Sequence, residues 1–145
     1  MLAKMVAGGT METPDVLYTN PSPSSNYAGG TIVTSTQLNG YKYVVVAFKY
    51  STTDSTIRYI ISKIYDDTTA PMYYASGQLL GIAGANTATA YKSSVTRGIS
   101  INRGGIYVSN GTRTTDSADQ PQACIPLKVW GFKSDFPAIF EDLPS

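Results

Sequence analysis

The sequence predicts an all-β protein, a β-sandwich of the jelly-roll type with a short arm at each end. Two runs of β-branched and aromatic residues, Tyr41–Tyr50 and Ile57–Tyr65, have the composition of strands. Turn signals recur about every 8–12 residues, which is the spacing expected of a sandwich or jelly roll. A chain of 145 residues is the size of one domain. We therefore expect an N-terminal arm over residues 1–10, one sandwich domain over 11–133 and a C-terminal arm over 134–145.

The first expected strands are short. Asp15–Thr19 precedes the turn-rich segment 20–26, and Thr31–Leu38 is rich in threonine. The second of these strands is expected to end at the turn formed by Asn39 and Gly40.

The two long runs are expected to be adjacent central strands. The polar loop between them, residues 51–55, has the size of a hairpin connection. Both faces of Tyr41–Tyr50 are largely apolar, which predicts a strand buried on both sides. The residues expected in the core are Val44, Val46, Phe48, Ile60 and Ile64.

Several shorter strands are expected in the second half of the chain. They are Pro71–Ala75, Ala88–Val95, Gly98–Asn102 and Ile106–Ser109, followed by a closing strand over Cys124–Lys133. Pro126 cannot donate to a ladder, so we expect that point to lie at a sheet edge or a strand start. Trp130, in the closing strand, is expected in the core or at a subunit contact.

Both ends of the chain carry apolar residues outside the strand pattern. The C-terminal arm has the i, i+3, i+4, i+7 spacing of one face of a short helix, with Phe136, Ile139, Phe140 and Leu143 at these positions. Such a helix is too short to be stable alone in water. The N-terminal arm carries a small apolar cluster, Leu2, Met5 and Val6. We expect both segments to be assembly arms that dock on a neighbouring subunit, and docking on the chain's own sandwich is the alternative.

The chain contains no histidine and a single cysteine, Cys124. Histidine is the side chain that most readily exchanges protons near neutral pH, and it is the commonest metal ligand. Its absence excludes Ser-His-Asp and Cys-His catalytic groups and histidine zinc sites, and one thiol excludes paired-cysteine sites. We expect no enzyme activity, no cofactor and no metal site. Cys124 lies in an apolar context, so we expect a buried, inert thiol.

Acidic loops offer the remaining candidate chemistry. Asp66 and Asp67 could supply oxygen ligands to calcium, but the spacing of a calcium-binding loop is missing, so a solvated turn is expected. A carboxylate pair for glycoside hydrolysis would need two of Asp54, Asp66, Asp116 and Asp119 to meet. Nothing in the sequence brings two of them together.

The charge of the chain limits the classes of partner that it can bind. Only 14% of residues are charged and the net charge is +1, whereas an average globular domain has about 25% charged residues. Basic residues are scattered singly, so we expect no nucleic-acid partner. No stretch approaches the roughly 18 apolar residues of a membrane span, so we expect no membrane insertion. Low surface charge favours an oligomer or a large assembly.

Four of the eleven tyrosines suggest a second kind of surface. Aromatic faces stack on sugar rings, and the neighbouring Ser, Thr and Asn residues can bond sugar hydroxyls. The tyrosines that could make a carbohydrate contact are Tyr73, Tyr74, Tyr91 and Tyr107. The alternative is that tyrosine is present here as a good strand former whose hydroxyl reaches the surface.

Three stretches of the chain resemble a known family. They are LYTNPSPSSNYAGGTIVTSTQLNGYKYVVVAFKYS, RGISINRGGIYVSNG and ACIPLKVWGFK, and together they cover roughly residues 11–133. This pattern resembles small structural domains of tailed bacteriophages, which are generally labelled head-fibre, tail-fibre or minor structural proteins.

The resemblance implies a structural component of a tailed-phage virion, an exposed head- or tail-associated decoration or fibre protein. It implies copies of the chain itself, as a trimer, and other virion proteins as partners. The protein would be made in the bacterial host cytoplasm and located in the virion. The resemblance transfers no catalytic residues. The alternative function is a receptor-binding module that recognises host cell-wall carbohydrate.

Overall fold

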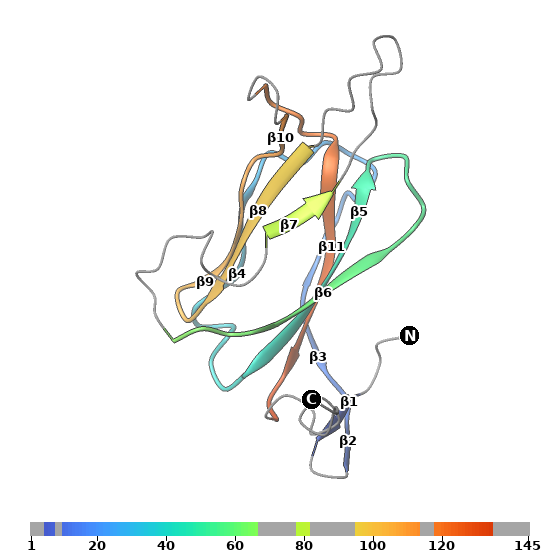
Figure 1. The fold of residues 1–145 in the computed structure, drawn as a ribbon. Helices are drawn as coiled ribbons and strands as arrows, with labels where there is room; N and C mark the ends of the chain where they lie inside the picture. Colours follow the sequence, from blue (N-terminus) through green and yellow to red (C-terminus); the bar gives the residue numbers. More distant parts are fainter. Residues whose placement is uncertain (1–4, 8–9, 67–77, 82–94, 114–117, 135–145) are drawn as a thin grey trace, which may run out of the picture.

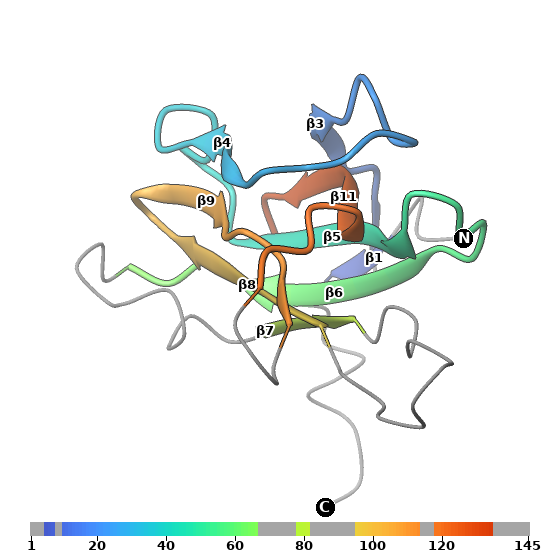
Figure 2. The same cartoon turned by 90° about the horizontal axis from the view of Figure 1, so that it is seen from above.

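The fold was analysed in a computed structural model, which describes residues 5–7, 10–66, 78–81, 95–113 and 118–134. The prediction of an all-β sandwich is confirmed, because two antiparallel sheets pack against each other (Figure 1, Figure 2). No helix lies within the described residues. The expected C-terminal helix and the expected strand Pro71–Ala75 lie outside them, as does the expected strand Ala88–Val95 except for Val95, which begins a strand of the structure.

The first sheet has the strand order β3-β11-β5-β6. These strands are β3 (Asp15–Thr19), β11 (Ala123–Phe132), β5 (Tyr43–Ser51) and β6 (Arg58–Lys63). The two long runs of the sequence are adjacent as predicted, since β5 pairs with β6. β5 is central, but β6 is the last strand of the described sheet, because β11 pairs with β5 on its other side.

The second sheet is built around a hairpin. Its strands follow the order β10-β8-β9-β4, and β7 also pairs with β8. They are β4 (Gly30–Thr34), β7 (Gln78–Gly81), β8 (Val95–Asn102), β9 (Gly105–Val108) and β10 (Thr112–Arg113). The chain crosses between the sheets from β3 to β4 and from β4 to β5, as in a jelly roll, whereas β5–β6 and β8–β9 are hairpins within one sheet.

The strand expected over Thr31–Leu38 is shorter than predicted. β4 ends at Thr34, and the chain then turns, with the backbone N–H of Leu38 donating to the Thr34 carbonyl at 3.1 Å. At the end of the strand the Thr34 N–H donates to a side chain, Gln37 Oε1, at 2.9 Å. The side chain of Leu38 is fully buried at the end of this turn.

The core lies between the two sheets. Its inner row in the first sheet runs across four strands in register, with Tyr18, Val129, Val46 and Ile60 opposite one another. Four of the expected core residues, Val44, Val46, Phe48 and Ile64, are buried, and Ile60 is partly buried against them. The second sheet contributes Ile99, Ile101, Ile106 and Val108. The thiol of Cys124 is free and buried, as expected.

A buried asparagine supports a bulge in β11. Register shifts between Pro126 and Lys128, so that Leu127 is an extra residue opposite β5. Asn20 donates from its side-chain amide to the Pro126 carbonyl and from its backbone N–H to the Leu127 carbonyl, both at 2.8 Å. Pro126 is therefore inside the strand, at a bulge, and does not mark the strand's start.

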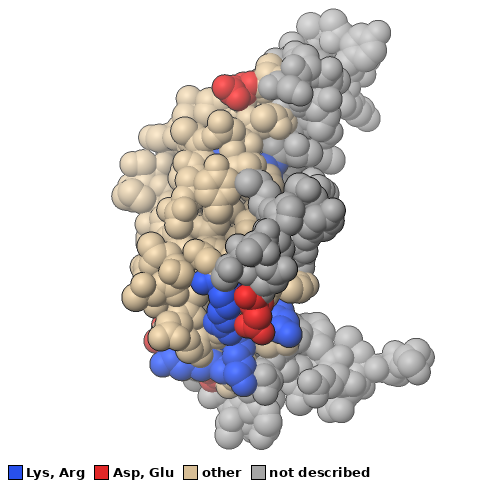
Figure 3. Space-filling view, turned by 90° about the vertical axis from the view of Figure 1, so that its left-hand side faces the viewer, with Lys and Arg blue, Asp and Glu red and all other residues tan. Residues whose placement is uncertain are grey.

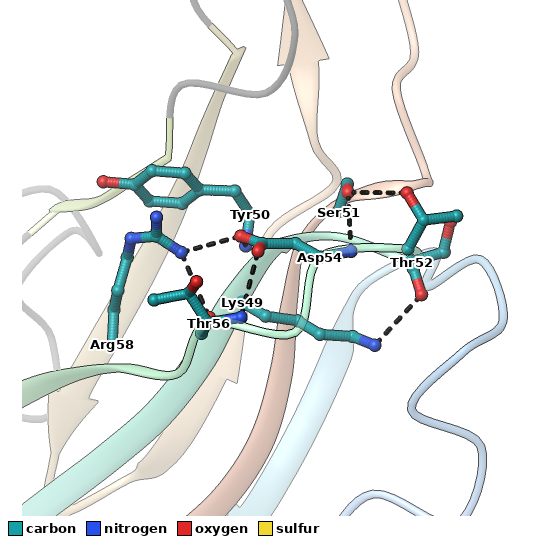
Figure 4. A network of polar contacts seen from close by, with 8 residues as sticks. Lys49, Tyr50, Ser51, Thr52, Asp54, Thr56 and Arg58 are labelled. Atoms are coloured by element: carbon teal, nitrogen blue, oxygen red, sulfur yellow. Dashed lines mark hydrogen bonds and ion pairs between the residues drawn. The ribbon is translucent and has the colours of Figure 1, made fainter.

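The hairpin loop between β5 and β6 is held by one carboxylate (Figure 4). Asp54 accepts hydrogen bonds from the Thr56 N–H at 3.0 Å and from Arg58 Nη1 at 2.7 Å. Hydrogen bonds from Thr56 and Arg58 lower the pKa of Asp54. The Arg58 guanidinium carbon lies 3.3 Å from the centre of the Tyr50 ring, a cation–π contact. Asp54 thus serves a turn within its own hairpin.

An N-terminal hairpin is tied to the end of the last strand. β1 (Met5–Ala7) pairs with β2 (Thr10–Glu12) in a separate two-stranded sheet. The Glu12 carboxylate accepts hydrogen bonds from the backbone N–H groups of Lys133 at 2.6 Å and Ser134 at 3.1 Å. Burial acts to raise the pKa of Glu12, but the hydrogen bonds from Ser134 and Lys133 outweigh it and lower the pKa below its usual value. The segments that lead into both arms therefore leave the sandwich at the same end.

Candidate assembly face and loop pocket

The outward side of the first sheet carries an apolar row. Register places Val16 opposite Trp130, Trp130 opposite Val45, and Val45 opposite Ile61, so this row crosses all four strands. Trp130, Val45 and Ile61 are the sequence neighbours of inner-row residues, so this row lies on the other face of the sheet. Residues opposite one another on paired strands share a face. Val16 is 54% exposed and Ile61 is 40% exposed. The row is therefore apolar and open to solvent at both of its ends.

Tyr59 lies on the same side of β6 as Ile61, two residues before it, and so borders this row. It lies opposite Ala47, is 45% exposed, and its ring centre is 6.4 Å from that of Trp130. Val45 and Ala47, in the middle of the sheet, are buried. We call Val16, Val45, Tyr59, Ile61 and Trp130 the outer apolar face.

The outer apolar face departs from the usual sandwich pattern. A sheet in a two-layer sandwich normally places polar residues on the side away from the core. The exposed members of the outer apolar face, Val16 at one end and Tyr59 and Ile61 at the other, are separated by the buried Val45 and the partly exposed Trp130. Exposed apolar residues that gather on one face mark an interaction surface more often than scattered ones do. Trp130 belongs to this face and not to the core cluster, which favours the subunit-contact interpretation of that residue.

A buried arginine, Arg97, organises the end of the sandwich where β11 begins, away from the contact of Glu12 with Ser134. Arg97 has no exposed surface. It lies on the same inward face of β8 as Ile99 and Ile101, two and four residues further along the strand. Its guanidinium donates to the carbonyl oxygens of Ala123 at 2.8 and 3.1 Å, Ser109 at 2.7 Å and Tyr27 at 2.9 Å. Burial lowers the pKa of Arg97, because a charged guanidinium loses solvation there. One side chain of the second sheet thus holds two loop residues, Tyr27 and Ser109, and the first residue of β11 in the first sheet.

Two glycines allow these loops to close around Arg97. A Cβ atom on Gly111 would lie 2.5 Å from the Gln120 carbonyl oxygen and 3.0 Å from Arg97 Nη2. Gly29 has a φ of +101°, and its Cβ would lie 2.7 Å from the Asn110 side-chain oxygen. Any other residue at these two positions would force the loops apart.

A pocket of about 200 Å³ opens over this junction. It is lined by Tyr27, Ala28, Asn110, Gly111, Asp119 and Pro121. Tyr27 shares a side-chain hydrogen bond with Tyr18, and burial raises the pKa of Tyr27 to about 12. The exposed side chains of Asn110 and Asp119 make no hydrogen bond or ion pair with the described residues.

Charged side chains border both the outer apolar face and the pocket, since Lys128 Nζ lies 5.7 Å from the centre of the Trp130 ring and Asp119 lines the pocket. Figure 3 shows one side of the molecule on which most of the described surface is uncharged and the Lys and Arg side chains gather at the lower end. Arg103 pairs with Asp66 at 3.2 Å and donates to the Tyr41 carbonyl oxygen at 2.6 Å. Asp66 therefore takes part in an ion pair at the surface. In the described part of the chain, no three acidic, Cys or His side chains are grouped so that they could hold a metal ion.

Most of the tyrosines proposed for carbohydrate contact are outside the described residues. Tyr73, Tyr74 and Tyr91 fall there, so only the fourth, Tyr107, is placed by the structure. Tyr107, on β9, is 39% exposed and lies opposite Thr31 on the outward side of the second sheet. It does not line the pocket.

The assembly-arm residues are described only in part. Met5 and Val6 belong to β1. The remaining expected arm residues, Leu2, Phe136, Ile139, Phe140 and Leu143, lie outside the described residues.

Comparison with known proteins adds no relative. No protein-family model matches the chain, and no curated protein or solved structure is significantly similar to it. Among the described residues, no helix has the length and apolar character needed to cross a membrane.

Proposed function

We propose that this chain is a structural component of a tailed-phage virion, a head- or tail-associated decoration or fibre protein that assembles with copies of itself. The observation that carries the proposal is the outer apolar face, which leaves Val16, Tyr59 and Ile61 between 40% and 54% exposed. The resemblance of residues 11–133 to small phage structural domains gives the assembly its setting. The absence of histidine agrees with a structural role and with no catalytic one.

The occupant of the outer apolar face is the C-terminal arm of a neighbouring copy. Trp130 lies four residues before Ser134, the last described residue, so the arm leaves β11 close to this face. The arm carries apolar residues at helical spacing that need a surface to cover them, namely Phe136, Ile139, Phe140 and Leu143. Full burial of one such side chain contributes about 1.5–3 kcal/mol, so several of them outweigh any surface ion pair.

The low charge of the chain favours this association. With eleven basic and ten acidic residues, copies of the chain repel each other little when they meet. The trimer expected from the resemblance would place one arm on each neighbour in a closed ring.

Truncation tests the proposal directly. Deleting residues 135–145 should leave the sandwich folded, as shown by an unchanged strand signal in circular dichroism, and should abolish oligomers in sedimentation velocity. A folded truncated chain with unchanged stoichiometry would contradict the arm. Loss of folding on truncation would instead show that the arm completes its own domain's core.

Labelling of particles tests the virion setting separately. An antibody against this chain should decorate intact phage particles at discrete positions in electron micrographs. Failure to label particles whose proteins include this chain by mass spectrometry would rule out an exposed decoration or fibre protein.

A further inference from the structure

We infer that the pocket over Arg97 binds a single neutral pyranose ring of a glycan, an activity beyond the proposed assembly role. The pocket lies at the end of β8 that carries Arg97, whereas the Glu12–Ser134 contact lies where β11 ends. Ligand binding there leaves the outer apolar face free.

The size of the pocket sets the size of the ligand. Its volume of about 200 Å³ corresponds to the liquid volume of roughly seven water molecules. Sites for drug-sized ligands begin at roughly 300 Å³, so this pocket suits one sugar ring and not an oligosaccharide.

The chemistry of the lining matches a sugar. Tyr27 and Pro121 line the pocket, and apolar surface of this kind can pack on the C–H face of a pyranose. The Tyr27 ring is half-buried against the core, with the Arg97 guanidinium 5.3 Å from its centre. The Asn110 amide both donates and accepts, and the Asp119 carboxylate accepts, so together they can bond neighbouring hydroxyl groups. Both side chains are exposed and neither is bonded to a described residue, so no described contact has to break when a ligand binds.

The charge of the described lining disfavours an anionic ligand. Asp119 lies at the wall of the pocket and is exposed. Among the described side chains, Arg97 is the cation that reaches this junction, and it is buried beneath the loops and donates to the carbonyl oxygens of Tyr27, Ser109 and Ala123. An acidic sugar would therefore meet the Asp119 carboxylate, and the Arg97 guanidinium is already bonded to carbonyl oxygens.

The walls of the pocket are held in place before any ligand arrives. The Tyr27 N–H donates to the Pro121 carbonyl at 2.7 Å, and the Gln120 N–H donates to the Gly111 carbonyl at 2.8 Å. Arg97 holds the Tyr27 carbonyl from below. A pocket built in this way loses little conformational freedom on binding, which favours affinity.

Saturation-transfer difference NMR on the full chain tests the inference, because it reports on the ligand whatever the oligomeric state. The probes are the methyl glycosides of glucose, galactose, N-acetylglucosamine and rhamnose. At least one should give a saturable signal with a Kd of about 1–10 mM, the range of a single-ring ligand. The Asp119→Ala and Asn110→Ala variants should each bind at least tenfold more weakly.

A matched carboxylate provides the control. Asp66→Ala removes an exposed carboxylate at the other end of β8 and should leave the Kd unchanged. Absence of a saturable signal with all four glycosides would overturn the inference. Equal binding by Asp119→Ala and the unsubstituted chain would show that any sugar binds elsewhere, and would overturn it equally. Neither result bears on self-association, which sedimentation measures independently.

Discussion

Arg97 on β8 donates two hydrogen bonds to the carbonyl oxygen of Ala123 on β11, at 2.8 and 3.1 Å, and so joins the two sheets of the sandwich. The next residue, Cys124, has a φ of +51°, a conformation that is uncommon for a residue other than glycine. The strands therefore meet here through one buried guanidinium and a local departure from strand geometry.

Arg97→Met should destabilise the fold strongly. It removes the donors to the carbonyl oxygens of Tyr27, Ser109 and Ala123, and each buried acceptor left without a partner costs about 1–3 kcal/mol. We expect a loss of at least about 3 kcal/mol in the free energy of unfolding, measured by urea denaturation. Arg58→Met, which removes a partly exposed ion pair and a cation–π contact in the β5–β6 loop, is the control and should cost clearly less, because solvent screens that pair. Equal losses would mean that Arg97 does not hold the loops together.

Gly111→Ala should distort the pocket. The added Cβ would lie 2.5 Å from the backbone oxygen of Gln120, which cannot move without shifting its loop. We expect a lower melting temperature, measured by differential scanning calorimetry. Gly40→Ala is the comparison. Its added Cβ meets no atom within 4 Å, so any loss of stability there reports the backbone strain of its φ of +86° and not a clash. A Gly111→Ala chain at least as stable as the unsubstituted protein would contradict the close contact with Gln120.

Glu12→Gln should remove one source of acid sensitivity. The pKa of Glu12 is lower in the folded chain than its ordinary value, so its charged form stabilises the fold above the unfolded-state pKa. That stabilisation is lost as pH falls from about 5 through the lowered folded pKa. The melting temperature of the unsubstituted protein should therefore fall more steeply than that of Glu12→Gln over this window. Parallel curves would show that the contact with Lys133 and Ser134 is not made in solution.

Tyr27 should make the fold sensitive to alkali. Its pKa is raised to about 12, so the stability that depends on its neutral form is complete below the ordinary value of about 10. That stability is then lost as pH rises from about 10 to 12. Tyrosinate absorbance should show a late-titrating tyrosine that disappears in Tyr27→Phe. A Tyr27→Phe chain with an unchanged titration curve would contradict the burial and the Tyr18 contact.

The strand pattern of β5 and β6 was predictable from the sequence, because β-branched and aromatic residues fill both runs and the loop between them has hairpin length. The end of β4 at Thr34 was not predictable, since the Thr34 N–H is bonded by the side chain of Gln37, three residues further along the chain. The position of β6 at the end of its sheet depends on the pairing of β11 with β5, a contact between segments more than 70 residues apart that no local pattern encodes.

The candidate sites were predictable only in part. Val45 and Trp130 alternate visibly with core positions, but the register that aligns them with Val16 and Ile61 arises from the folded sheet. Arg97 was missed, although its spacing from Ile99 and Ile101 places it on the inward side of a strand and could have identified it. Asn110 and Asp119 come together only because the loops close around that arginine.

The most direct test of the account is the oligomeric state of Ile61→Lys. Ile61 is 40% exposed on the last described strand of the sheet, where a lysine is tolerated in a folded monomer. Thr31→Lys is the matched control, because Thr31 is an exposed strand residue on the outward side of the other sheet.

Sedimentation velocity at micromolar concentration gives the measurement. The account predicts an oligomer for the unsubstituted chain and for Thr31→Lys, and a folded 15.5 kDa monomer for Ile61→Lys. A monomeric unsubstituted chain, or an Ile61→Lys chain that assembles with the same stoichiometry, would contradict the claim that the outer apolar face drives assembly.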